Sequence, residues 1–187
     1  PHLNVDPIVA ASHIISNAQT IVSREISPQD PGVLTFGKIQ SGFAPNIIPD
    51  SVNIEGTIRA YSQDVREKIY SSLERISKLS AESMRSTAST EIMYGAGPVV
   101  NEQEVASWVR DKAREVLDDS LVGPTEPVSV GDDMAEFLQR IPGVYFLLGA
   151  SVGNKYPHHN TRFDFDEKAM INGVKVFLSC TLDFLNN

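Results

Sequence analysis

The stretch SVNIEGTIRA, residues 51–60, shows the clearest regular alternation of apolar and polar residues in the chain. One side carries the apolar or small residues: Val52, Ile54, Gly56, Ile58 and Ala60. The other side carries the polar residues: Ser51, Asn53, Glu55, Thr57 and Arg59. Because neighbouring side chains of a β-strand point to opposite faces, this pattern predicts a strand with one face buried and the other in solvent.

Two predicted helices and a second predicted strand surround this segment. Residues 4–25 place apolar side chains at helical spacing. Asp6 followed by Pro7 is typical of a helix start, since Asp caps free N–H groups and Pro loses no hydrogen bond at the first helical position. Residues 33–39 are predicted as a strand, and residues 62–84 as a second helix with a continuous apolar stripe.

A further strand is predicted over residues 89–95, STEIMYG. The order is then helix, strand, strand, helix, strand. This is the order of a ferredoxin-like split βαβ unit whose first strand is absent and would lie before Pro1. Residues 95–101, GAGPVVN, break the pattern. We therefore expect a domain boundary there, with one domain over residues 1–98 and another over residues 99–187.

The second domain is expected to mix short helices and strands. The predicted elements are a helix over 102–117, a strand near Val128, a helix over 132–141, a buried strand over 143–150 and a helix from Asp166 onward. Two short strands in about 90 residues are too few to close a layered α/β structure. We expect this part to be the tail end of a larger domain.

Composition and charge favour an ordinary soluble globular protein. The 187 residues are 41% apolar and 21% charged. A net charge of −8 argues against nucleic-acid binding, and no apolar run has the length of a membrane span. The single Cys180 excludes an intrachain disulfide and suits the cytoplasm. The chain begins at Pro1 without a signal peptide, so we expect a fragment or part of a longer protein.

Two adjacent histidines, His158 and His159, are the first candidates for chemistry. Side chains of adjacent loop residues diverge, so one could bind a metal ion while the other packs or donates a hydrogen bond. A zinc site needs three or four ligands. His2, His13 and Cys180 do not complete a ligand pattern, so the chain alone is not expected to build a complete catalytic metal site.

Asn46 and Arg59 form a second candidate set, because an arginine and an asparagine on one side of a sheet could clamp a carboxylate. A solvated sheet face explains the same pattern. Asp132 and Asp133, followed by Glu136, are typical of a helix N-terminus, where acidic side chains interact favourably with free N–H groups.

Several segments, in this order, together resemble a known family: APNIIPDSVNIEGTIRAY (44–61), GDDMAEFL (131–138), PGVYFLLG (142–149) and HHNTRFDFDE (158–167). They are similar to the two-metal amidohydrolases of the aminoacylase and glutamate-carboxypeptidase type, in the branch of hippurate hydrolases, indole-3-acetyl-amino-acid hydrolases and N-acyl-amino-acid deacylases. The resemblance implies an α/β protein. Residues 1–98 would be an α+β, ferredoxin-like lid and dimerisation domain lacking its first strand, and residues 99–187 the C-terminal part of a zinc-peptidase-like α/β catalytic domain.

The resemblance also implies roles for individual residues. His159 lies four residues before Phe163 of the closing motif and is implied as a metal ligand, with His158 as the second candidate. Asn46 and Arg59 are implied to hold the substrate's carboxylate and its polarised carbonyl, reaching into a partner subunit's site. Thr161 stands where relatives often have proline. His2 does not replace the lid histidine of the family, which would lie upstream.

The activity implied by the resemblance is hydrolysis of the amide bond of an N-acyl amino acid. Two divalent metal ions, zinc or manganese with cobalt or nickel as further candidates, would activate a bridging water. The general base and the other ligands would lie upstream of this chain, so no catalytic residue is assigned within it. A homodimer through the lid domain is implied. Composition and charge, rather than the resemblance, favour the cytoplasm and argue against nucleic acid or a membrane as a partner. The alternative is a non-catalytic dimerisation or binding fragment of such an enzyme.

Overall fold

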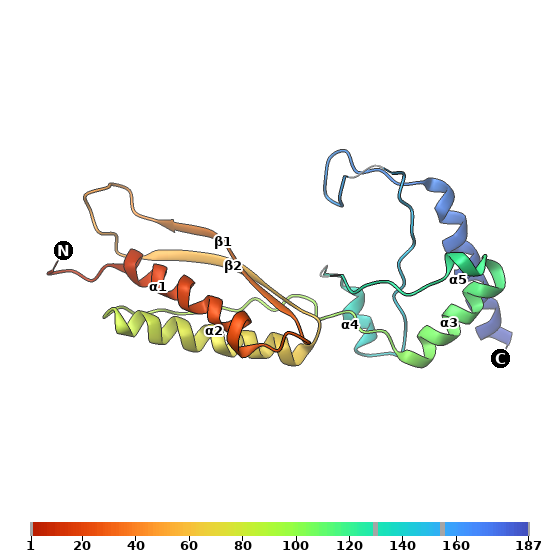
Figure 1. Ribbon diagram of the computed structural model, residues 1–187, viewed down its shortest axis with the longest axis horizontal. Helices are drawn as coiled ribbons and strands as arrows, with labels where there is room; N and C mark the ends of the chain where they lie inside the picture. The colour runs from red at the N-terminus through yellow and green to blue at the C-terminus, as the bar shows by residue number, and fades with distance from the viewer. Residues whose placement is uncertain (1, 129–130, 154–155, 187) are drawn as a thin grey trace. The chain divides into compact units, whose positions relative to one another are not determined.

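A computed structural model describes residues 2–128, 131–153 and 156–186 (Figure 1). The chain divides into two compact units, with a boundary between Pro98 and Val99. Unit 1 is the chain up to Pro98 together with Gly131, and unit 2 contains Val99–Val128 and the chain from Asp132 onward. In the described part of the chain, no helix combines the length and the apolar character needed to cross a membrane.

Unit 1 begins with a helix, continues with a β-hairpin and returns with a long helix. Its elements are α1 (Pro7–Thr20), a π-helical turn η1 (Ile21–Glu25), β1 (Gly32–Ser41), β2 (Val52–Ala60) and α2 (Gln63–Ser83). Asp6 accepts hydrogen bonds from the N–H groups of Ile8 and Val9 at 2.9 and 3.3 Å, which satisfies donors that a helix start leaves free. The two predicted helices and the two hairpin strands are confirmed.

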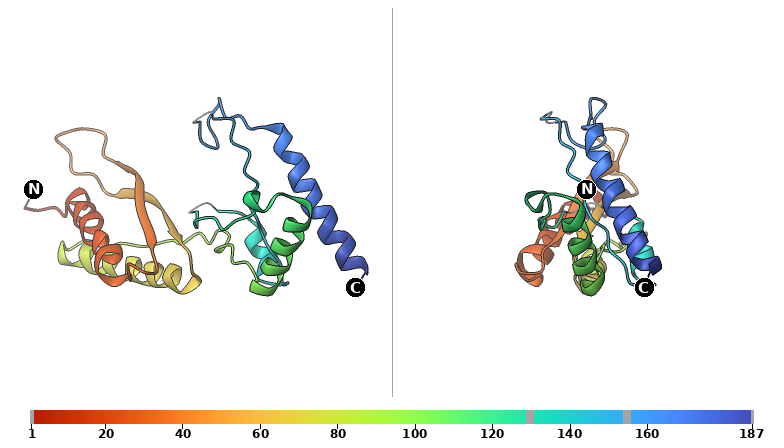
Figure 2. Two further views of the ribbon diagram at one scale, coloured as in Figure 1. Left: turned by 45° about the vertical axis from the view of Figure 1, so that its right-hand side comes forward. Right: turned by 90° about the vertical axis from the view of Figure 1, so that its right-hand side faces the viewer.

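The hairpin is antiparallel, and its register runs from Gly32 opposite Ala60 to Ser41 opposite Val52. A bulge interrupts the pairing between Phe36 and Lys38. Helices α1 and α2 lie along one face of the hairpin (Figures 1 and 2). The buried cluster between these layers consists of Ala18, Ile21, Ile69, Leu73 and Ile76, with half-buried apolar side chains of both strands packed against it. The alternation in residues 51–60 thus faces the helices on its apolar side and solvent on its polar side.

The strand predicted over residues 89–95 is wrong, because these residues belong to no sheet. Side chains from Ser86 to Ile92 do alternate between half-buried and exposed, as in an extended chain. A strand also needs a neighbour for its N–H and C=O groups. In the predicted arrangement that neighbour would be the absent first strand. The observed sheet has two strands among the described residues, so the ferredoxin-like arrangement of unit 1 stays a prediction.

Unit 2 is built mainly on two helices, α3 (Gln103–Val116) and α5 (Met170–Asn186). Shorter elements are the 3₁₀ turns η2 (Asp119–Leu121) and η3 (Glu167–Ala169) and the helix α4 (Met134–Leu138). The helices predicted over 102–117 and from Asp166 onward are confirmed. The helix predicted over 132–141 is shorter, because Pro142 disfavours helical backbone at the residue before it.

The strands predicted near Val128 and over residues 143–150 are also wrong, since the described residues there have no strand partners. Val144 and Phe146 nevertheless pack against the core of unit 2, which consists of Val109, Ala113 and Val176. Leu147 and Leu148 are 49% and 42% exposed, so the predicted full burial of this segment is wrong too. The described architecture is a mixed α/β one with a small two-stranded sheet.

Candidate metal-ligand loop and substrate-binding residues

The histidine pair lies on a loop whose ends are held together. The N–H of Asp166 donates to the carbonyl of Ala150 at 2.8 Å, which closes the neck of the loop. The Asp166 carboxylate also accepts from the N–H of Lys168 at 3.0 Å and so caps the turn that leads into α5. Asp166 therefore both closes the loop and begins the turn that leads into α5.

The two histidines differ in their surroundings. The ring of His158 lies 4.8 Å from the ring of Phe163, centroid to centroid, in a tilted contact. His159 has a φ of 67°, in the left-handed region that a residue with a Cβ rarely adopts. Both side chains are exposed. One histidine thus packs on the aromatic of the closing motif, and its neighbour occupies the strained position. Strained backbone of this kind concentrates at functional sites.

Three further residues support this loop, and the sequence analysis missed all three. Arg162 donates from Nη1 to the hydroxyl of Tyr156 at 2.9 Å, and its guanidinium lies 5.5 Å from the centre of the Tyr156 ring. The side chain of Asn160 accepts from the N–H of Arg162 at 2.9 Å. Tyr156 and Arg162 lie six positions apart in the sequence, and an aromatic residue near a basic one could have suggested a contact. A sequence spacing alone, however, does not show that the loop folds back to bring them together.

A metal site needs several ligands, and one histidine supplies a single one. Among the residues that the structure describes, no three His, Cys, Asp or Glu side chains gather in an arrangement that could hold an ion. Neutral imidazole is a suitable ligand for zinc, and an exposed His159 is accessible to an ion. His159 as the metal ligand and His158 as the second candidate both stay predictions.

The two predicted substrate-binding residues lie at opposite ends of the hairpin. Asn46 belongs to the connection that joins Ser41 to Val52, whereas Arg59 lies opposite Val33 at the other end of the register. The seven residue-to-residue steps from position 52 to position 59 span about 23 Å. The register therefore does not favour a single small carboxylate held by both residues of one chain. Their individual roles in substrate binding stay predictions.

The solvent face of the hairpin also carries an ion pair between Lys38 and Glu55. The Lys38 Nζ donates to Glu55 Oε1 at 2.7 Å, and this contact holds the pKa of the Glu55 carboxyl below its ordinary value. Asn53 donates to the same oxygen at 3.0 Å. The polar face is thus an interacting set of side chains, as the solvated-face interpretation expects, with Arg59 exposed near one end.

Asp132 begins a helix, as its sequence position predicts. Its Oδ1 accepts from the N–H of Met134 at 2.8 Å, at the start of α4. Its Oδ2 accepts from the hydroxyl of Tyr145 at 3.0 Å, and that hydrogen bond raises the pKa of Tyr145. Asp133 makes no capping hydrogen bond with its side chain. Through these two contacts, Asp132 stabilises the start of α4 and holds Tyr145, which is a structural role.

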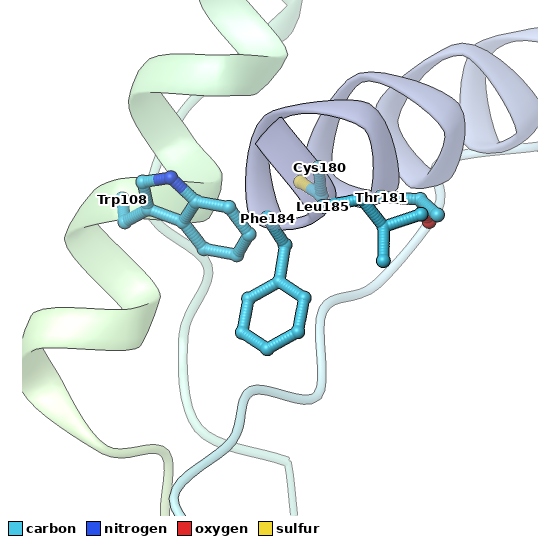
Figure 3. Close-up of a pocket in the computed structure, with 5 residues that line it drawn as sticks. All are labelled: Trp108, Cys180, Thr181, Phe184 and Leu185. Carbon is cyan, nitrogen blue, oxygen red and sulfur yellow. The ribbon is translucent and has the colours of Figure 1, made fainter. Parts of the chain in front are cut away.

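An open apolar pocket of about 270 Å³ lies between α3 and α5 (Figure 3). Its lining residues are Trp108, Cys180, Thr181, Phe184 and Leu185. Burial raises the pKa of the Cys180 thiol, which disfavours the reactive thiolate. This pocket therefore offers apolar contact and no group activated for catalysis.

Comparison with known sequences places these features in context. The sequence profile of peptidase family M20/M25/M40 matches residues 8–183. N-acetyl-L-cysteine deacetylase of Bacillus subtilis is 33% identical over 171 residues, which cover 91% of this chain and 40% of the relative. Thermostable carboxypeptidase 2 of Saccharolobus solfataricus is 34% identical over 191 residues, which cover 100% of this chain and 48% of the relative.

Two solved structures resemble the chain. One is a putative aminohydrolase from methicillin-resistant Staphylococcus aureus, with a TM-score of 0.91 and 30% identity over 99% of this chain and 48% of that one. The other, a dinuclear metal-binding peptidase of the M20 family from Bacillus subtilis, has a TM-score of 0.82 and 23% identity over 98% of this chain and 47% of that one. The chain spans less than half the length of each of these four proteins.

Proposed function

The chain belongs to peptidase family M20/M25/M40, and from this premise we propose that it is part of a metal-dependent enzyme that hydrolyses the amide bond of N-acyl amino acids. The observation that carries this proposal is the geometry of the histidine pair. His158 packs on Phe163, while His159 occupies a left-handed backbone position on an exposed loop. Relatives named as deacetylases of N-acetyl amino acids support the substrate class.

His159 is the residue that we propose as a metal ligand, with His158 as the second candidate. Two divalent ions are proposed for the whole enzyme, zinc or manganese, with cobalt or nickel as further candidates. When bound, such ions would lower the pKa of a water molecule and polarise the amide carbonyl. The ring contact with Phe163 would keep His158 away from the ion, and the Arg162–Tyr156 contact would stiffen the loop. We assign no general base among the described residues.

Unit 1 is proposed as the lid and dimerisation domain, and unit 2 as part of the catalytic domain. Asn46 and Arg59 of one chain lie too far apart to hold one small carboxylate together. In a homodimer formed through unit 1, Asn46 of one copy and Arg59 of the other copy could approach one substrate. The distance along the hairpin thus supports a site shared between two copies, in which the guanidinium binds the carboxylate bidentately.

A second candidate function is hydrolysis of a peptide's carboxyl-terminal residue. The similarity to a thermostable carboxypeptidase favours it. The two reactions share an amide next to a free carboxylate, so Arg59 would serve in either. A non-catalytic dimerisation or binding fragment of such an enzyme is the third candidate.

We propose that the protein is cytoplasmic. The test uses the protein purified from its own source and supplied with Zn²⁺ or Mn²⁺. N-acetylcysteine and a dipeptide are offered in parallel, and release of free amine is measured. We expect hydrolysis of the N-acetyl amino acid, reduced at least about 100-fold in His159→Ala, because metal sites lose most of their activity with a ligand. The control is His13→Ala, an exposed histidine on α1.

Each outcome of this assay separates the candidates. Preference for the dipeptide would favour the carboxypeptidase function. Dimerisation without hydrolysis of either amide, at any metal concentration, would favour the binding fragment. Equal activity of His159→Ala and His13→Ala would contradict the proposed role of His159.

A further inference from the structure

The histidine loop of unit 2 contains two consecutive tight turns. The N–H of Asn160 donates to the carbonyl of Pro157 at 3.2 Å, and the N–H of Phe163 donates to the carbonyl of Asn160 at 3.0 Å. Each of these hydrogen bonds closes a β-turn. Asn160 ends the first turn and begins the second, so the backbone of the first turn depends on how the second is held.

His159 occupies the third position of the first turn, with a φ of 67°. A positive φ at this position favours glycine or asparagine, because most side chains with a Cβ collide with the backbone there. A histidine stays in such a conformation only when the surrounding contacts over-determine it. The contacts that could do so come from the second turn and from the residue before the first.

Arg162 links the two turns through its backbone and its side chain. Its N–H donates to the side-chain oxygen of Asn160 at 2.9 Å. Its Nη1 donates to the hydroxyl of Tyr156 at 2.9 Å, and the guanidinium carbon lies 5.5 Å from the centre of the Tyr156 ring. Tyr156 directly precedes the first turn, whereas Arg162 belongs to the second, so this pair closes the loop around His159. We call Tyr156, Asn160 and Arg162 the loop brace.

We propose that the loop brace holds His159 in its left-handed backbone conformation and so sets the direction from which its imidazole meets a metal ion. The part of this inference that concerns the ion rests on the proposed function. Tyr156 and Arg162 are positioning residues, since they act through His159. A ligand that is already held in its binding geometry loses less conformational freedom when the ion arrives, so the brace strengthens ion binding.

The first measurement is nuclear magnetic resonance of the whole protein, labelled with ¹⁵N-histidine and freed of metal by chelation. A positive φ brings a residue's amide proton close to its own Hα, so His159 should show a strong nuclear Overhauser effect between these protons. The peak is identified by its absence in His159→Ala. Tyr156→Leu removes the hydroxyl and the aromatic ring, and the effect at His159 should then fall to that of His13 in α1.

The second measurement is the dissociation constant of Zn²⁺, obtained by competition with a chelator of known affinity. Tyr156→Leu and Arg162→Met should each raise it about tenfold, as does the loss of other groups that orient a metal ligand. The double variant should lose no more than either single one, because the two residues form one contact. Arg140→Met is the matched control: it removes an exposed arginine of unit 2 that pairs with Glu136, and both measurements should stay unchanged.

A rescue variant separates positioning from general stability. Thr161 occupies the second position of the second turn, where the fixed φ of proline is favoured. No hydrogen bond from the Thr161 N–H is found among the residues that the structure describes, so proline would remove none. Thr161→Pro, added to Tyr156→Leu, should restore the nuclear Overhauser effect at His159 and most of the lost affinity for Zn²⁺.

An unchanged nuclear Overhauser effect at His159 in Tyr156→Leu would overturn the proposal. So would a lost effect with unaltered Zn²⁺ affinity, because the backbone of His159 would then not position its imidazole. Additive losses in the double variant, or no rescue by Thr161→Pro, would also count against the brace. If wild type binds no ion, the proposed function itself fails, while the signal of the metal-free protein still decides whether the brace holds His159.

Discussion

Gly32 of β1 packs directly beneath α2, and the fold predicts what a methyl group there would do. A Cβ at this position would lie 2.6 Å from Ile69 Cδ1 and 3.1 Å from Val65 Cγ1. Ile69 is fully buried, so its terminal methyl has no solvent to move into. Gly32→Ala should therefore push α2 away from the sheet or turn Ile69 out of its preferred rotamer.

The magnitude follows from opposing contributions. Overpacking a closed core costs about 1–3 kcal/mol. Replacing glycine also restricts the unfolded chain, which stabilises the fold by about 0.5 kcal/mol. The net loss for Gly32→Ala should be about 1–2 kcal/mol in the free energy of unfolding. Ile69→Val alone should cost about 1 kcal/mol for the lost methyl. In the double variant the two changes fill and empty the same space, so their effects should fall short of additive by about 1–2 kcal/mol.

The assay is urea denaturation of the four proteins, followed by far-ultraviolet circular dichroism. Gly37→Ala is the matched control, because a Cβ at Gly37 of the same strand would meet nothing within 4 Å. This control should stay within about 0.5 kcal/mol of wild type. The double variant should be more stable than Gly32→Ala alone. Strictly additive losses would refute the packing of α2 on β1 described here.

Two further predictions concern charged groups. The pKa of Glu25 is lowered by its hydrogen bond with Arg75, so Glu25 stabilises unit 1 above its usual pKa and loses this effect as the pH falls through the lowered pKa. Glu25→Gln should cost under about 1 kcal/mol at neutral pH, since Arg75 is exposed and Glu25 is half-buried, and nothing in strong acid, as urea denaturation at several pH values would show. The pKa of Asp183 is lowered by Lys112 and by the indole N–H of Trp108, which donates to it at 2.8 Å. Fluorescence of Trp108, the single tryptophan, should therefore titrate below the ordinary aspartate range and lose this transition in Asp183→Asn.

Local patterns predicted the local elements of the chain. Alternation over residues 51–60, helical spacing over 62–84 and the Asp6–Pro7 start each depend on near neighbours in sequence, and the structure confirms all three elements. The Asp132 cap belongs to the same class, because a helix start needs only the two or three residues that follow.

Pairing and side-chain convergence could not be predicted in this way. Residues 89–95 and 143–150 have the composition of strands, but a strand forms only beside a partner that the sequence pattern does not identify. Asn46 and Arg59 are 13 positions apart, and the sequence left open whether they share one side of a sheet. The hairpin register separates them, because the connection and the far end of β2 lie at opposite ends.

The histidine pair falls between these cases. Divergence of adjacent side chains predicted that at most one histidine could bind an ion. It could not identify which one packs, because the contact of His158 with Phe163 depends on the turns of the loop. The left-handed backbone of His159 is likewise visible only in three dimensions.

Metal analysis of the protein purified from its own source tests the central claim most directly. Plasma mass spectrometry would give the number of divalent ions per chain in wild type, in His159→Ala and in the His158→Ala control. We expect two ions per chain in wild type, fewer in His159→Ala and the wild-type number in His158→Ala. The same metal content in His159→Ala as in wild type would contradict the assignment of His159, and no bound divalent ion in wild type would contradict the metal-dependent function itself.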